Sequence, residues 1–288
     1  MTISHTVAGT GPPVLLLHGF PETRAMWRDI EPLLAATWTV VAVDLPGYGR
    51  SPAVAGRSSK RAMAADLVDM MSALGFAEFA VAGHDRGARV AYRMALDHPH
   101  RVRRLAALDI VPTALVWERA DARVTLSFWP WSLLAQPAPL PETMLAAAAD
   151  AIVEDALSQW GSPPTAFPAE VRAAYAEQLR TPHGICEEYR SAATTDREHD
   201  EADLAAGRRI SCPTLVLWSR GSGLDQWYAD AGGPLGIWRQ WCSDVRGEAV
   251  DGGHFFPEVF PAATAGRLRS FLAGDAPNEA DTVVLPDR

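Results

Sequence analysis

Short runs of apolar residues recur along the chain, and turn-forming residues bound each run. Runs such as VLLL and TLVLW show no alternation of polar and apolar positions. Strands that are apolar throughout are typical of a parallel sheet that helices cover on both faces. The expected strands cover residues 14–17, 39–43, 79–82, 105–110, 214–218 and, from a weaker pattern, 248–250.

Helical patterns separate several of these runs. In residues 62–74, apolar side chains recur at helical spacing. Ser58 and Ser59 precede this segment and Gly75 follows it, and these residue types suit the start and the end of a helix. Strands that alternate with helices predict an α/β fold with a mostly parallel central sheet.

The alternation stops after residue 111 and resumes near residue 212. The stretch between is rich in Ala, Trp and Pro, and its clearest helical patterns cover residues 144–157 and 170–179. We expect a helical lid inserted between two parts of one core. The expected division is a core of residues 1–111 and 212–273, a lid of residues 112–211, and a mobile tail of residues 274–288.

The composition limits the partners and the location of the protein. The chain has 48% hydrophobic residues and a formal net charge of −9, so nucleic acid and anionic membranes are not expected partners. No apolar run has the length of a membrane span, and the first residues lack a signal-peptide pattern, so we expect a cytoplasmic protein. The three cysteines have neither metal-ligand spacing nor an even count, so we expect no metal site and no disulfide framework.

The segment FAVAGHDRGARVAYRMALDHP carries the strongest chemical signal. A strand leads into GHDRG at residues 83–87, and a helix follows from about Ala88. This order matches the sharp Gly-x-nucleophile-x-Gly turn of the α/β-hydrolase fold, with Asp85 where lipases and esterases have Ser. We therefore predict the α/β-hydrolase fold, with Asp85 as the nucleophile.

A carboxylate nucleophile predicts a reaction in two steps. Asp85 attacks an sp³ carbon and expels a leaving group, and water activated by a histidine then hydrolyses the enzyme ester. His254 follows the last expected strand, where this fold places its histidine. The acid that orients His254 is Asp109 or Asp225, and we favour Asp109 because it follows its strand immediately. The backbone N–H groups of Phe20 and Arg86 are the expected oxyanion donors.

Arg86 and Arg89 open the helix after the nucleophile. Positive side chains at a helix N-terminus oppose the helix dipole, so a functional reason for them is expected. Residues three positions apart share one helix face, and a guanidinium can bind a carboxylate through two parallel hydrogen bonds. The pair therefore predicts a small anionic substrate held beside Asp85.

Five segments together resemble the haloacetate dehalogenase family, which includes the fluoroacetate dehalogenases. They are GHDRGARVAYRMALDHP, LDIVPT, WSLLAQPAPLPE, CEEYR and GGHFFPE, and the resemblance covers nearly the whole core and part of the lid. It implies a cofactor-free hydrolase that converts haloacetates to glycolate and halide, and a homodimer. The family's nucleophile falls on Asp85, and its carboxylate-binding pair falls on Arg86 and Arg89. Its acid falls on Asp109, and its histidine falls on His254.

The resemblance also implies a halide pocket in the lid. The family's halide-binding Trp and Tyr fall on Trp131 and Tyr189, but its halide-binding His is replaced by Pro130. Proline has no side-chain donor, so we expect chloroacetate and bromoacetate to be better substrates than fluoroacetate.

An epoxide hydrolase of the same fold is the alternative function. Such enzymes usually have Trp after the nucleophile, where this chain has Arg86, and use two lid tyrosines. The lid offers Tyr175 and Tyr189 without the recognised pattern. A haloalkane dehalogenase would leave two arginines unpaired beside a neutral substrate, and a non-enzymatic binding protein would leave the nucleophile, acid and histidine unused.

Overall fold

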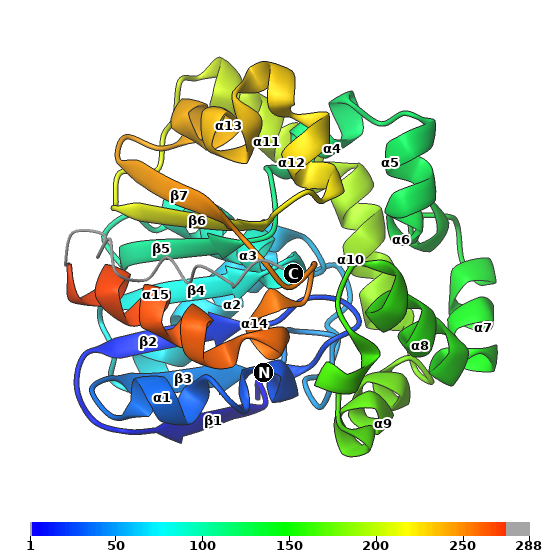
Figure 1. Cartoon of the computed structure of the whole chain (residues 1–288), viewed down its shortest axis with the longest axis horizontal. Coiled ribbons are helices and arrows are strands. Elements are labelled where there is room, and N and C mark those ends of the chain that lie inside the picture. Colours follow the sequence, from blue (N-terminus) through cyan, green and yellow to red (C-terminus); the bar gives the residue numbers. More distant parts are fainter. Residues whose placement is uncertain (1, 275–288) are drawn as a thin grey trace, which may run out of the picture.

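Seven strands form a single central sheet in the computed structural model, which describes residues 2–274 (Figure 1). The expected tail therefore lies, from residue 275 onward, outside the described residues. The strand order is β1-β3-β2-β4-β5-β6-β7; β1 pairs antiparallel with β3, and the other neighbours pair in parallel. The strands are β1 His5–Ala8, β2 Pro13–Leu17, β3 Thr39–Val43, β4 Phe79–His84, β5 Val102–Leu108, β6 Thr214–Ser219 and β7 Val245–Val250.

The sheet confirms the predicted fold class, and the differences from prediction lie in its two edge strands and in the bounds of β5. The edge strand β1 was not predicted, and the other edge strand, β7, begins three residues before the expected range. Both are only partly buried and contain polar residues, so neither shows the continuous apolar run of a central strand. β5 ends at Leu108 and not at residue 110, because Asp109 has a φ of 55°, which an extended strand cannot accommodate.

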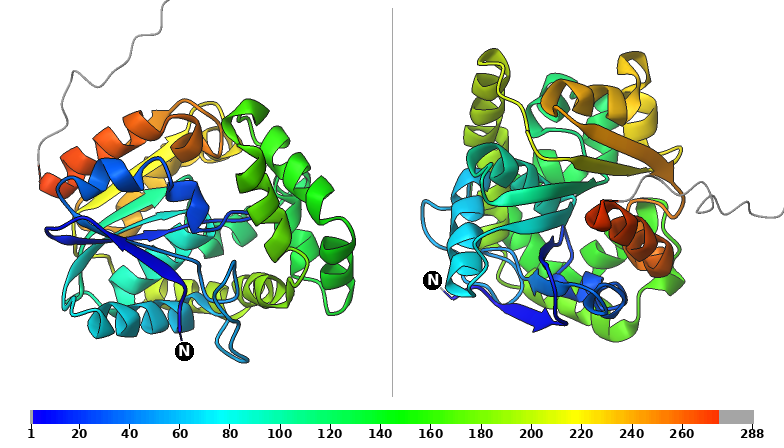
Figure 2. Two further views of the ribbon diagram at one scale, coloured as in Figure 1. Left: turned by 90° about the horizontal axis from the view of Figure 1, so that it is seen from below. Right: turned by 90° about the vertical axis from the view of Figure 1, so that its left-hand side faces the viewer.

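Helices cover both faces of the sheet (Figure 2). The α2 and α3 helices pack together on one face, and α1 and α15 lie against the other. The predicted start of α2 is confirmed, because Ser59 Oγ accepts a hydrogen bond from Ala62 N at 3.2 Å. The core helices are η1 Arg24–Trp27, α1 Glu31–Ala35, α2 Lys60–Ala73, α3 Arg86–Asp97, α12 Gly223–Trp227, η3 Ala229–Ala231, α13 Gly233–Trp241, α14 Phe256–Val259 and α15 Pro261–Ala273.

Between β5 and β6 the described chain is helical and contains no strand. The helices from α5 to α10 lie together at one end of the sheet, and in this view α11 lies beside α13 (Figure 1). The α10 helix contacts both α2 of the core and α6 of the lid. The helices are α4 Thr113–Glu118, α5 Ala122–Ser127, α6 Trp129–Leu134, α7 Leu140–Ala147, α8 Ala149–Gln159, η2 Pro164–Ala166, α9 Ala169–Gln178, α10 His183–Ala193 and α11 Thr195–Ala205.

The single helix expected over residues 144–157 was wrong, because two helices meet there. Ala148 has φ −129° and ψ 28°, which is not helical, and it separates α7 from α8. An alanine-rich run has no Gly or Pro to mark such a break. None of the helices among residues 2–274 combines the length and apolar character required to cross a membrane.

Candidate active site

The turn at Asp85 has the geometry that the motif predicts. Asp85 directly follows β4 and has a φ of 42°, which is rare for a residue with a side chain. A Cβ added at Gly83 would lie 2.5 Å from Ala88 N, and one added at Gly87 would lie 2.5 Å from His18 O. Only glycine fits at these two positions, so the sharp turn depends on both flanking glycines.

The Asp85 carboxylate is buried among positive groups. Phe20 N donates to Asp85 Oδ2 at 3.1 Å, so one of the two expected oxyanion donors lies at the Asp85 carboxylate. Burial alone would raise the pKa of Asp85, but the charges of His254, Arg86 and Arg89 outweigh it and lower the pKa below its usual value. Asp85 is therefore ionised at neutral pH, as a nucleophile must be.

His254 pairs with Asp109. His254 Nδ1 lies 2.6 Å from Asp109 Oδ2, and Ser219 N donates to Asp109 Oδ1 at 2.7 Å. Asp225 accepts hydrogen bonds from Trp218 Nε1 at 2.8 Å and from Gly221 N at 2.9 Å. The structure therefore places Asp109 at His254 and Asp225 in a structural turn.

Two lid residues, Trp160 and Ser162, hold the loop that carries His254. The rings of Trp160 and His254 meet edge to face with centroids 5.3 Å apart, and His254 N donates to Trp160 O at 2.8 Å. Ser162 Oγ donates to Gly252 O at 2.7 Å and accepts from Phe255 N at 3.1 Å. Sequence reasoning missed this contribution, since no motif links the two segments.

A buried Glu22–His84 pair beside Asp85 was also missed. His84 Nδ1 lies 2.8 Å from Glu22 Oε2, and His84 Nε2 lies 2.8 Å from His254 O. Burial alone would lower the pKa of His84, but the Glu22 carboxylate outweighs it and raises the pKa to about 9. His84 is therefore an imidazolium at neutral pH, and both of its ring nitrogens donate. The position of His84 inside the GHDRG motif was the available signal, but its partner lies 62 residues away.

The two arginines each keep one buried nitrogen without a partner. Arg86 Nε donates to both oxygens of Glu188, at 3.1 and 2.9 Å, and Nη2 also contacts Glu188. Arg89 Nη1 donates to Val111 O at 2.9 Å and to Thr113 Oγ1 at 3.2 Å. Arg86 Nη1 and Arg89 Nε have no hydrogen-bond partner. We expected the Arg86 guanidinium to be available for two parallel hydrogen bonds to a substrate carboxylate. This expectation is wrong for its Nε–Nη2 edge, because Glu188 of the lid already binds that edge.

Trp131 and Tyr189 of the lid pack on these guanidiniums. The Arg86 guanidinium carbon lies 3.9 Å from the Tyr189 ring centroid and 4.9 Å from that of Trp131, and Arg89 lies 4.4 Å from Trp131. Neither the Trp131 indole N–H nor the Tyr189 hydroxyl makes a hydrogen bond to another described residue. Both polar groups are therefore unused by the surrounding protein. Pro130 is buried in the first turn of the same helix as Trp131, α6.

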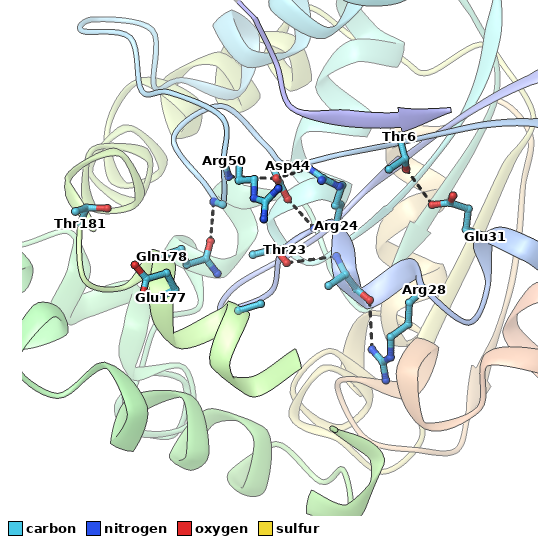
Figure 3. A pocket seen from close by; sticks show the side chains of 13 residues that line it. Thr6, Thr23, Arg24, Arg28, Glu31, Asp44, Arg50, Glu177, Gln178 and Thr181 are labelled. Carbon is cyan, nitrogen blue, oxygen red and sulfur yellow. Dashed lines mark hydrogen bonds and ion pairs between the residues drawn. The ribbon is translucent and has the colours of Figure 1, made fainter. Parts of the chain in front are cut away.

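The candidate site is nearly closed. Asp85 is 8% exposed and Arg86 is fully buried. A cavity of about 510 Å³ lies elsewhere, between η1 and the lid helix α9 (Figure 3). Two of its arginines are paired, Arg24 with Asp44 at 2.7 Å and Arg28 with Glu258. None of its lining residues belongs to the candidate site around Asp85.

Glu142, His183 and Glu187 lie close enough on the lid to share a metal ion. Arg190 already lies 2.7 Å from Glu142 and 2.6 Å from Glu187, so this cluster is an ion-pair network away from Asp85.

Comparison with known proteins agrees with this geometry. Residues 12–261 match the family model of the α/β hydrolase fold, so the chain is an α/β-hydrolase. A fluoroacetate dehalogenase from Burkholderia sp. is 43% identical over 95% of this chain and 91% of its own length. The chain therefore belongs to the haloacetate dehalogenase family of α/β-hydrolases, which confirms the resemblance seen in its motifs.

Epoxide hydrolases are also related to the chain. A soluble epoxide hydrolase from Corynebacterium sp. is 29% identical over 93% of each chain. A mutant of a Pseudomonas aeruginosa protein described as an epoxide hydrolase, solved with MFA bound, is 41% identical. It has a TM-score of 0.89, with 94% of this chain and 92% of that one covered. Similarity alone therefore leaves two substrate classes to compare.

Proposed function

We propose that this protein is a haloacetate dehalogenase that works through an ester of Asp85. The observation that carries the proposal is an ionised carboxylate beside two buried arginines, each with a nitrogen that no protein group occupies. A buried N–H without a partner costs free energy, so a site built this way favours an anionic ligand. Burial and the neighbouring charge of Arg86 lower the pKa of Arg89. A bound carboxylate would stabilise the charged form of Arg89.

In the first step, Asp85 displaces the halide. The haloacetate carboxylate lies between Arg86 Nη1 and Arg89 Nε, which brings the halogen-bearing carbon toward Asp85. One Asp85 oxygen forms a bond to this carbon as the carbon–halogen bond breaks, and the halide leaves with the bonding electrons. The Trp131 N–H and the Tyr189 O–H donate to the departing halide. Burial raises the pKa of Tyr189, so its hydroxyl keeps its proton at neutral pH.

In the second step, His254 activates water. The water attacks the carbonyl carbon of the Asp85 ester, and His254 takes its proton. Asp109, 2.6 Å from His254 Nδ1, stabilises the imidazolium that forms. Phe20 N donates to the oxyanion, because it already lies 3.1 Å from an Asp85 oxygen. Collapse of this intermediate breaks the bond between the carbonyl carbon and the glycolate oxygen, and His254 returns its proton to that oxygen. Glycolate leaves, and Asp85 is restored as a carboxylate when its remaining acid proton passes to solvent.

An epoxide hydrolase remains the second candidate, because relatives of that kind share the fold and most of the chain length. Two observations favour the haloacetate. The hydroxyl of Tyr175 donates to Glu258 at 2.9 Å, so a second lid tyrosine is not free to protonate an epoxide oxygen. A neutral epoxide would also leave both arginine nitrogens unpaired.

A direct assay separates the two candidates. The purified protein is incubated with chloroacetate, with bromoacetate and with styrene oxide, and halide and diol are measured. We expect halide release from both haloacetates and no diol above the Asp85→Asn background. Diol without halide would assign the protein to the epoxide hydrolases.

A cytoplasmic location remains a prediction that fractionation of the source cells tests.

A further inference from the structure

Glu188 lies at the centre of a buried group of charged residues, and the reaction steps above do not use its carboxylate. Its carboxylate contacts Arg86 of α3 and Lys60 of α2, and accepts a hydrogen bond from Tyr48 OH at 2.9 Å. Glu188, Arg86 and Lys60 have side chains 2% exposed or less. A carboxylate buried this deeply is stable only when it is paired and fully hydrogen-bonded, as it is here.

The contacts of Glu188 fix which nitrogen of Arg86 is free. Glu188 takes the Nε–Nη2 edge of the guanidinium, and Nη1 keeps no protein partner. Because the guanidinium is planar and rigid, holding one edge fixes the direction of the other nitrogen. Without Glu188, the Arg86 side chain would have to find another partner for two buried N–H donors.

The lid supplies this contact together with a second one. Glu188 and Tyr189 are neighbours in α10; Glu188 binds the edge of Arg86, while the Tyr189 ring lies 3.9 Å above its face. Arg86 belongs to the core, so two consecutive lid residues hold a core side chain from two directions. Lys60 holds Glu188 in turn, and Lys60 N donates to Asp196 Oδ1 of α11 at 2.8 Å.

We propose that Glu188 is a positioning residue, which orients Arg86 from the lid so that Nη1 can bind the substrate carboxylate. Glu188 does not touch the substrate in this account, and it acts through Arg86. The inference rests on the proposed function, since it assigns Nη1 to a carboxylate ligand. Its effect is therefore expected in the binding of carboxylates more than in the chemical steps.

The test compares Glu188→Gln with the wild-type protein. KM for chloroacetate and the inhibition constant of acetate, an unreactive carboxylate, are measured from steady-state chloride release. Neither constant depends on the fraction of protein that is folded. We expect both to rise about tenfold or more in Glu188→Gln, because a charge-assisted contact that orients Arg86 is lost, with a smaller change in kcat.

Glu187→Gln is the matched control. Glu187 is the neighbouring residue, its side chain is 42% exposed, and it pairs with Arg190 away from Asp85. Both constants should stay at the wild-type values in this variant. Glu188→Asp keeps the charge but shortens the reach, so both constants should lie between those of the wild type and Glu188→Gln.

The outcomes separate the two proposals. If the wild-type protein releases no halide from haloacetates, the proposed function fails and the role of Glu188 fails with it. If the wild type is active while Glu188→Gln shows an unchanged or lower KM and inhibition constant, only the positioning role is overturned. If Glu188→Gln does not fold, a wild-type KM and inhibition constant in Glu188→Asp overturn the positioning role as well.

Discussion

Asp85 and Asp109 share an unusual backbone conformation. They are the two non-glycine residues with positive φ in the described part of the chain, at 42° and 55°. Such conformations cost roughly 1–3 kcal/mol each and persist where the surrounding structure holds them. Both residues directly follow parallel strands; the Asp109 carboxylate contacts His254, and the charge of His254 lowers the pKa of Asp85. The strain therefore falls on the two acids that the proposed reaction uses.

Replacing Asp109 tests its role against that of Asp225. Asp109→Asn should keep the fold, because Asn tolerates positive φ, but it should reduce turnover of chloroacetate by about 10²–10⁴ through loss of the charge that supports His254. Asp225→Asn keeps the size of a side chain that bonds Trp218 and a loop N–H, and should remain active. Steady-state halide release decides between them; an inactive Asp225→Asn beside an active Asp109→Asn would reverse the assignment.

The Glu22–His84 pair predicts a dependence of stability on pH. The pKa of His84 is raised to about 9 in the folded protein, above the value of 6.5 of an exposed His. The stabilising contribution is therefore complete below pH 6.5 and is lost as the pH rises through 9, a change of at most about 3 kcal/mol.

Urea unfolding at several pH values measures this change. The wild-type free energy of unfolding should fall between pH 6.5 and 9 relative to that of Glu22→Gln, in which His84 no longer faces a carboxylate. Parallel pH curves for the two proteins would show that His84 is not charged in the folded state.

At the scale of elements, the sequence predicted those strands and turns that have a local sequence pattern. The central strands were found from continuous apolar runs, and the turn at Asp85 from its two glycines. The edge strand β1 and the break at Ala148 were missed because half-exposed strands and alanine-rich helices lack such signals. The contacts of Arg86 with Glu188 and of Glu22 with His84 were missed for another reason. They join residues 102 and 62 positions apart, and only the folded chain brings these together.

The α6 helix sets the expected halogen preference. Pro130 lies in its first turn, where proline is tolerated. The resemblance to the family implies a histidine donor at this position. Departure of fluoride depends on hydrogen bonds more strongly than departure of chloride does. Loss of one preorganised donor in a closed site reduces the rate by roughly 10²–10³. We therefore expect a higher kcat/KM for chloroacetate than for fluoroacetate.

Fluoride and chloride release from the wild type and from Pro130→His measure the preference. The substitution should raise fluoroacetate turnover relative to chloroacetate, since it restores a donor next to Trp131. A wild-type kcat/KM for fluoroacetate equal to that for chloroacetate would contradict this role for Pro130.

At the scale of the whole molecule, the lid closes the site that the core provides. The core supplies Asp85, Asp109, His254 and both arginines, while the lid supplies Trp131, Tyr189 and Glu188. A closed site keeps the electrostatic interactions strong, because water is excluded from it. It would also allow a molecule with a net charge of −9 to bind the proposed anionic substrate, since the local arginines act at short range.

The homodimer expected from the family is a prediction about the assembly. Light scattering during size-exclusion chromatography should give twice the mass of one chain at micromolar concentration. A mass equal to that of one chain would contradict it without affecting the proposed chemistry.

The covalent ester on Asp85 is the central claim, and trapping it is the most direct test. His254→Gln should complete the first step with chloroacetate and stall before hydrolysis, because no base activates water. Mass spectrometry of the digested protein should then show a carboxymethyl group on the peptide that contains Asp85, and none in Asp85→Asn. A single turnover with no adduct, or with the adduct on another residue, would contradict the account.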